Sequence, residues 1–115
     1  MLLKQILSLV LVMLVEMAIA FSTPALAAET PNGAKIFETQ CAGCHINGGN
    51  IVRRGKNLKQ KVLKKYGMDS VEAIANIVTN GQGNMSAYKD RLTAEEIQAV
   101  SAYVLQQAEA GWRKQ

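Results

Sequence analysis

The segment Cys41-Ala-Gly-Cys44-His45 constrains this chain more than any other feature of its sequence. It contains the only histidine of the 115 residues and both cysteines. In a C-x-x-C-H segment, two thiols add to the vinyl groups of a haem and the adjacent imidazole becomes an axial ligand of the iron. The sequence therefore predicts one covalently attached haem c, held by Cys41 and Cys44, with His45 on its iron.

Other uses of these residues fit the sequence less well. A thiol–disulfide redox pair of the thioredoxin type would place Cys41 and Cys44 beside a βαβ pattern, and the sequence shows no convincing strand. A structural zinc site needs about four Cys or His ligands, more than this chain has. The remaining alternative is a chance occurrence of the motif.

The first 27 residues have the pattern of a secretory signal peptide. Lys4 precedes an apolar run over residues 6–21, and Ala25-Leu26-Ala27 supplies a small-x-small ending. Glu16 interrupts the run, which is shorter than the roughly 20 residues of a membrane span, so an uncleaved anchor is the less favoured alternative. We expect residues 1–27 to be cleaved and residues 28–115 to form one exported domain with no stable membrane insertion.

A basic segment follows the motif. Residues 39–68 contain no acidic side chain and seven basic ones: Arg53, Arg54, Lys56, Lys59, Lys61, Lys64 and Lys65. The simplest explanation is a solvated helix face. The functional alternative is a docking surface for an acidic partner, because such fields raise encounter rates. Nucleic acid is not an expected partner, since no recognition motif accompanies the charge.

Hydrophobic periodicity and capping residues predict four helical segments and no strand. The first begins near Asn32 and reaches the Cys41 region, and the second covers residues 57–66 with Asn57 as a possible N-cap. The third begins at Asp69 or Ser70 and ends at residue 80. The fourth begins at a Thr93-x-x-Glu96 capping box. A capping box from Asp69 to Glu72 is also expected.

The second axial ligand has two candidates in residues 28–115, Met68 and Met85. Met68 lies at a helix junction, where packing is its expected role. Met85 lies in the middle of the loop 81–92 and is the predicted ligand. A thioether raises the reduction potential and fills the second axial position, which suits electron transfer. No catalytic acid, base or substrate pocket is evident, so a carrier is expected rather than an enzyme.

Several segments taken together resemble the cytochrome c6 family. They are Asn32-Gly-Ala-Lys-Ile-Phe37, the haem motif, Lys65-Tyr-Gly-Met68, Val78-Thr-Asn-Gly81, Arg91-Leu92 and the ending Ala102-Tyr-Val-Leu-Gln-Gln-Ala-Glu-Ala-Gly-Trp112. The resemblance implies an all-α, small class I cytochrome c fold of about four helices around one haem. It also implies a monomer in the thylakoid lumen or periplasm that passes electrons from the cytochrome b6f complex to photosystem I or a terminal oxidase.

The resemblance assigns further roles. Gly33 is expected to let the first helix cross the last one close to Tyr103, and Trp112 is expected to pack rather than relay electrons. Arg91 matches a family arginine near the haem edge, where it resembles a partner-docking residue.

Three departures from the family pattern stand out. Ser86 replaces a proline after Met85, which predicts a less rigid loop. Arg53-Arg54 replaces Met-Pro, so the hydrogen-bond partner of the His45 ring is open, with a nearby backbone carbonyl expected. Ile77 stands where photosynthetic members commonly carry glutamine, and we expect it to lower the potential. Two alternatives follow: a low-potential c6-like carrier, or a haem-based ligand sensor in which Met85 dissociates.

Overall fold

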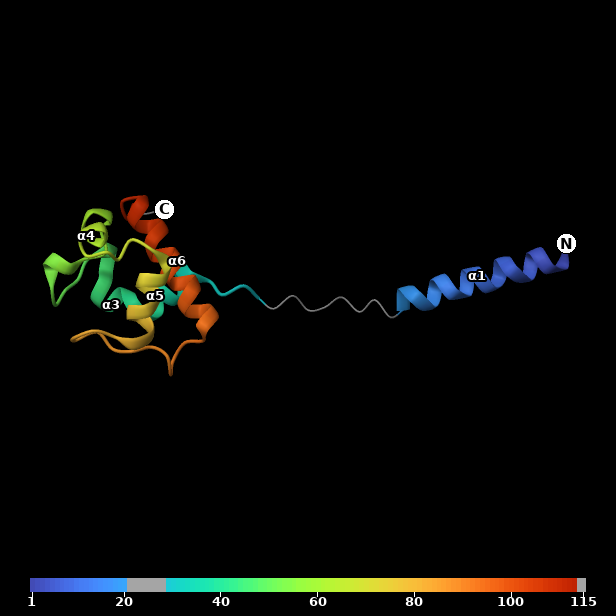
Figure 1. Ribbon diagram of the computed structural model, residues 1–115, viewed down its shortest axis with the longest axis horizontal. Helices are drawn as coiled ribbons and strands as arrows, with labels where there is room; N and C mark the ends of the chain where they lie inside the picture. Colours follow the sequence, from blue (N-terminus) through green and yellow to red (C-terminus); the bar gives the residue numbers. More distant parts are fainter. Residues whose placement is uncertain (21–28, 114–115) are drawn as a thin grey trace.

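The computed structural model describes residues 1–20 and 29–113 as helices joined by loops (Figure 1). No strand occurs in these two ranges, where Gln82 and Met85 form one isolated antiparallel bridge. The all-α prediction is therefore confirmed.

The N-terminal helix α1 (Leu2–Ala20) contains most of the predicted signal peptide. Its large apolar side chains from Leu2 to Met17 are exposed to solvent. Within the described residues no helix is both long and apolar enough to cross a membrane. The predicted cleavage site after Ala27 lies outside the described residues, so the cleavage itself stays a prediction.

The first predicted helix of the domain is confirmed, but it is longer and less regular than expected. It consists of α2 (Gly33–Ile36), a π-helical turn η1 (Phe37–Cys41) and α3 (Ala42–His45). The Asn32 side chain caps its start by accepting a hydrogen bond from the Lys35 N–H at 3.1 Å. The helix therefore includes the whole haem motif instead of ending near Cys41.

The second predicted helix is shorter than expected. Two 3₁₀ turns, η2 (Ile46–Gly48) and η3 (Arg54–Lys56), precede α4 (Gln60–Lys65). The proposed N-cap Asn57 was wrong, because α4 begins after Lys59. The Asn57 side chain instead accepts from the Lys59 N–H at 3.0 Å and forms a local turn before the helix.

The two remaining helices begin at capping residues. α5 (Val71–Asn80) has Ser70 as its N-cap, and the Ser70 hydroxyl accepts from the Ala73 N–H at 3.1 Å. The helix thus starts at the second of the two predicted residues. The expected capping box from Asp69 to Glu72 is wrong, because Ser70 is the cap and Ala73 has no side-chain acceptor to complete a box. α6 (Ala94–Glu109) has the predicted box, with both the Thr93 and Glu96 hydrogen bonds present.

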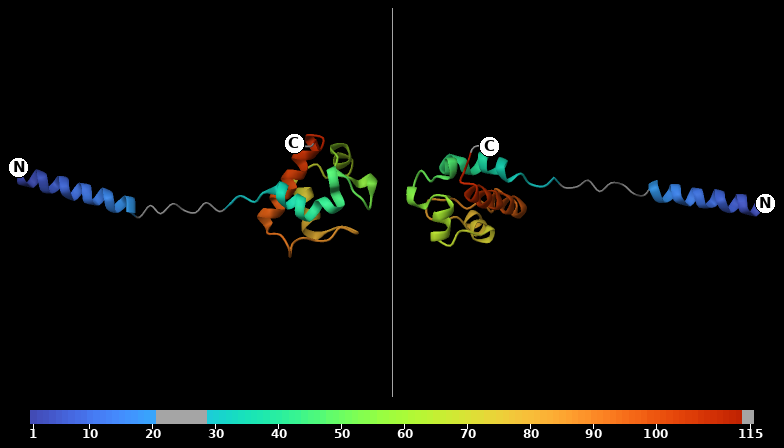
Figure 2. Two further views of the ribbon diagram at one scale, coloured as in Figure 1. Left: turned by 180° about the vertical axis from the view of Figure 1, so that it is seen from behind. Right: turned by 90° about the horizontal axis from the view of Figure 1, so that it is seen from above.

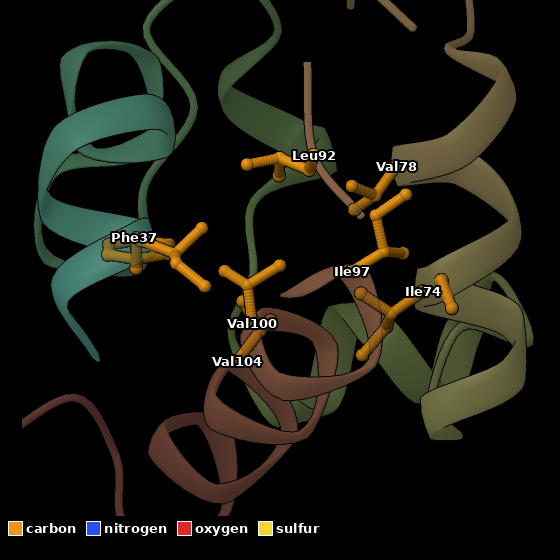
Figure 3. Packing of buried hydrophobic residues seen from close by; sticks show 9 residues of the cluster. Phe37, Ile74, Val78, Leu92, Ile97, Val100 and Val104 are labelled. Carbon is orange, nitrogen blue, oxygen red and sulfur yellow. The ribbon is translucent and has the colours of Figure 1, made fainter. Parts of the chain in front are cut away.

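The core of the domain lies between α2, η1, α5 and α6. Figure 3 shows Phe37 on one side of Val100 and Val104, with Ile74 and Val78 on the other side. Cys41 and Met85 are partly buried against this same cluster. The core thus connects the haem motif to the predicted methionine ligand.

The first and last helices of the domain cross in direct contact (Figure 2). A side chain at Gly33 would overlap the Ala99 carbonyl oxygen and lie 2.9 Å from Tyr103 Cβ. Beside this crossing the Phe37 ring packs against Tyr103 and Trp112, with centroids 5.5 and 5.2 Å away. The expected roles of Gly33, Tyr103 and Trp112 in packing agree with this geometry.

The crossing predicts a large cost for Gly33→Ala. The added methyl group meets main-chain atoms that cannot move without separating α2 from α6, and overpacking costs about 1–3 kcal/mol. We expect the free energy of unfolding of the holoprotein to fall by that amount in a denaturant titration. Gly55→Ala is the control, since its new Cβ meets no atom within 4 Å and should change stability little.

Candidate functional site

The two cysteines and the histidine of the motif lie on one short stretch of helix. Cys41 ends the π-helical turn η1, and Cys44 and His45 are the last two residues of α3. Cys41 and His45 are half-buried, whereas Cys44 is exposed. π-Helical turns inside helices occur frequently at functional sites. Here the turn ends at Cys41, the first of the residues that would hold the haem.

The His45 imidazole is held in a single orientation by a backbone acceptor. Its Nδ1 lies 2.8 Å from the Gly49 carbonyl oxygen. Because a carbonyl can only accept, Nδ1 carries the proton and donates, which leaves Nε2 as the atom able to ligate a metal. This bond supplies the partner that the sequence left open, a nearby backbone carbonyl.

The loop that contains Gly49 is fixed by the C-terminal end of the chain. A side chain at Gly48 would overlap the Trp112 indole, and the Trp112 Nε1–H donates to the Leu58 carbonyl at 2.9 Å. The Leu58 N–H donates in turn to the Gly48 carbonyl at 2.8 Å. Sequence reasoning missed this arrangement. The adjacent glycines Gly48 and Gly49 were its only signal.

Met85 lies in a tight hairpin-like turn after α5. The Gln82 and Met85 backbones exchange hydrogen bonds of 3.0 and 2.9 Å around Gly83, whose φ is +56°. A side chain at Gly81 would lie 2.6 Å from the Met85 carbonyl oxygen, so a glycine is required there. The Met85 side chain is half-buried against the core cluster. The loop is long, but the residue predicted as a ligand is held locally.

The two remaining predicted site residues lie before and after the Met85 turn. Ile77 is half-buried near the end of α5, and its carbonyl accepts from the Gly81 N–H at 2.7 Å. Arg91 is exposed, and its guanidinium lies over the Tyr88 ring at 4.2 Å from the centroid. Arg91 therefore makes a defined packing contact whether or not it also meets a partner.

The donor set suits a haem better than the alternatives. Within the described residues no three His, Cys, Asp or Glu side chains form a group that could hold a bare metal ion. Burial raises the pKa of the Cys41 thiol to about 11. Reactive cysteines of redox pairs have a lowered pKa instead, so a thioredoxin-like role disagrees with the site. Two thiols three residues apart, an oriented imidazole and a half-buried thioether fit covalent haem with His45 and Met85 as ligands.

Comparisons with known proteins agree with this donor set. A family model described as cytochrome C oxidase, cbb3-type, subunit III matches residues 28–104. A cytochrome c6-like protein of Nostoc sp. (strain PCC 7120) is 63% identical over 110 residues, covering 96% of this chain and 99% of the relative. A cytochrome c6 of the same strain is 53% identical over 110 residues with the same coverage.

A solved structure gives the same assignment. The crystal structure of cytochrome c6C from Synechococcus sp. PCC 7002 is 70% identical, with a TM-score of 0.67, and covers 68% of this chain and 95% of its own. The family model and these relatives have a c-type cytochrome domain in common. Within that group, the relatives indicate the cytochrome c6 family. The chain therefore belongs to the cytochrome c6 family of haem electron carriers, with one covalently bound haem c per chain.

Proposed function

We propose that this chain is a one-electron carrier in which Cys41 and Cys44 hold the haem and His45 and Met85 coordinate its iron from opposite sides. The observation that carries the proposal is the His45 Nδ1–H bond to the Gly49 carbonyl at 2.8 Å, which leaves Nε2 free to coordinate. When bound, the haem supplies an iron that alternates between Fe(III) and Fe(II).

The chain's own residues favour transfer of an electron over binding of a substrate. A hydrogen bond to a backbone carbonyl fixes the imidazole and raises its basicity as a ligand. Met85 would supply the second protein ligand to a bound haem, and a thioether ligand raises the reduction potential. With His45 and Met85 both bound, oxygen and other small ligands would have no open coordination site. We therefore propose a carrier rather than an enzyme.

We place this carrier in the thylakoid lumen or periplasm, where it takes electrons from the cytochrome b6f complex and passes them to photosystem I or a terminal oxidase. The signal-peptide pattern of residues 1–27 supports export. The match of the family model begins at residue 28, the first residue expected after cleavage. The relatives that are named cytochrome c6 support the choice of redox partners.

The basic segment supports docking to an acidic partner surface. All seven of its Lys and Arg side chains are exposed, and the ion pair found in the described residues, Lys35 with Glu38, involves none of them. The same region exposes Ile46, Ile51 and Val52, by 61%, 60% and 56%. Ile46 and Ile51 line one surface hollow with Arg54 and Lys59, and exposed apolar side chains beside cations match the anatomy of an interface with a polar rim.

Specific residues favour two alternatives to the ordinary carrier, one with a lowered potential and one that senses a small ligand. The aliphatic Ile77 favours a carrier with a lowered potential. The half-exposed Met85 and the serine after it leave room for a haem sensor in which the thioether dissociates and a small ligand binds.

The optical spectrum tests axial ligation and separates the carrier from the sensor. We expect the ferric holoprotein to show the methionine–iron charge-transfer band, and the ferrous form to leave carbon monoxide unbound. Met85→Ala should abolish the band and admit carbon monoxide. Met68→Ala is the matched control and should change neither property. Binding of carbon monoxide by the wild-type ferrous protein would support the sensor instead.

A redox titration tests the role of Ile77. The variant Ile77→Gln should have a higher midpoint potential than the wild type, since an amide dipole directed at the haem destabilises ferric iron and the aliphatic Ile77 supplies none. Asn76→Gln, on the preceding residue of α5 and exposed, serves as the control and should leave the potential unchanged. An unchanged or lower midpoint in Ile77→Gln contradicts the proposal.

The docking surface can be tested without knowing the partner, by using small redox probes of opposite charge. Oxidation by anionic hexacyanoferrate should slow severalfold when Lys64 and Lys65 are both changed to Gln, and should slow with rising salt in the wild type. A cationic cobalt complex should show the opposite trends. Lys35→Gln, outside the basic segment, is the control. Equal rates for the double variant and the wild type at low salt would rule out steering by this surface.

A further inference from the structure

We propose that Tyr88 is a positioning residue that ties the Met85 loop to the helix carrying the haem-binding cysteines, an inference that rests on Met85 being the proposed ligand. The Tyr88 hydroxyl donates a hydrogen bond of 3.0 Å to the backbone carbonyl of Gln40. Gln40 directly precedes Cys41, whereas Tyr88 follows Met85 by three residues. This bond therefore joins the two segments on which the haem would be mounted.

Tyr88 is also the first anchored residue after Met85. The backbone N–H groups of Ser86 and Ala87 donate no hydrogen bond among those present in the described residues, and both residues are exposed. The Tyr88 N–H then donates to the Val78 carbonyl at 2.9 Å. No backbone N–H between Met85 and Tyr88 donates such a bond, so loosening of Tyr88 would extend back as far as the Gln82–Met85 turn, which holds Met85 from the other side.

The surroundings of Tyr88 hold its ring in the orientation that the hydroxyl bond needs. The ring is partly buried against the core cluster. The Arg91 guanidinium lies over the Tyr88 ring, 4.2 Å from the ring centroid. The Arg91 and Leu92 N–H groups donate to the Tyr88 carbonyl, each at 2.9 Å. Main-chain, packing and cation–π contacts therefore direct one hydroxyl at one carbonyl.

The Tyr88 hydrogen bond restrains the Met85 loop in a different way from a proline within the loop. Ser86 follows Met85 and leaves the backbone dihedral of that position free, where a proline would fix it. Tyr88 restrains the same segment from its far end through a hydrogen bond to another element. Phenylalanine would keep the ring packing and the contact with Arg91 but would lose the tie. The substitution Tyr88→Phe therefore separates the hydrogen bond of the hydroxyl from the packing of the ring.

The test compares ferric wild-type and Tyr88→Phe holoproteins in stopped-flow displacement of Met85 by imidazole. At concentrations where the rate no longer rises, the loss of the methionine–iron charge-transfer band reports how fast Met85 leaves the iron. Loss of one net hydrogen bond predicts a rate about fivefold higher in Tyr88→Phe. The equilibrium affinity for imidazole, measured on the same samples, should rise by a similar factor.

Two controls isolate the hydroxyl bond. Tyr66→Phe removes a hydroxyl from an exposed ring far from the loop in sequence and should leave the rate unchanged. Gln40→Ala removes the side chain but keeps the accepting carbonyl, so it should also behave like the wild type. A rate in Tyr88→Phe within twofold of the wild type overturns the proposal, as does a fivefold rise in Tyr66→Phe. A wild-type protein without the charge-transfer band would instead refute the ligation by Met85 itself.

Discussion

The hydrogen bond from His45 Nδ1 to the Gly49 carbonyl is the interaction on which the haem site depends. It selects the tautomer that presents Nε2, and it fixes the plane of the ring. Its acceptor is a main-chain atom, so its position depends on how the loop after His45 is held. Trp112 holds that loop, through contact with Gly48 and a bond to the Leu58 carbonyl. The last residues of the domain thus orient a ligand near its beginning.

Because of this dependence, the residues that pack the helix crossing also hold the haem-binding residues in place. Trp112 packs on Phe37, and Phe37 begins the π-helical turn that ends at Cys41. Gly33 lets the same helix approach α6 closely enough for these rings to meet. A domain of this size has a marginal core, and a covalent haem would add the missing apolar contacts. The same residues therefore stabilise the fold and place the ligand.

Local sequence patterns predicted much of this structure. The haem motif, the Thr93 to Glu96 capping box and the position of Met85 between helices depend on residues close together in the chain, where propensity and spacing carry the signal. The predictions that failed were also local. Asn57 forms a turn instead of an N-cap, and Ser70 rather than Asp69 caps α5, because a short polar side chain can accept from the backbone N–H two or three residues on in a turn as well as in a helix cap.

The features that could not be predicted are long-range contacts. Nothing in the sequence pairs Tyr88 with the Gln40 carbonyl or Trp112 with Leu58, since these bonds form only after the helices have packed. The π-helical turn could not be predicted for a different reason, since its sequence has the pattern of an ordinary helix. These long-range contacts connect the packed helices to the proposed haem ligands. The structure therefore goes furthest beyond the sequence at the haem site.

Proton NMR of the reduced holoprotein, labelled at its methionine methyl groups, tests the central claim most directly. A methyl group bound to the haem iron lies over the macrocycle, whose ring current moves its resonance far upfield. The account predicts one such methyl, assigned to Met85, with the Met68 methyl at an ordinary position. Ordinary positions for both methyls, or an upfield methyl assigned to Met68, would contradict the account.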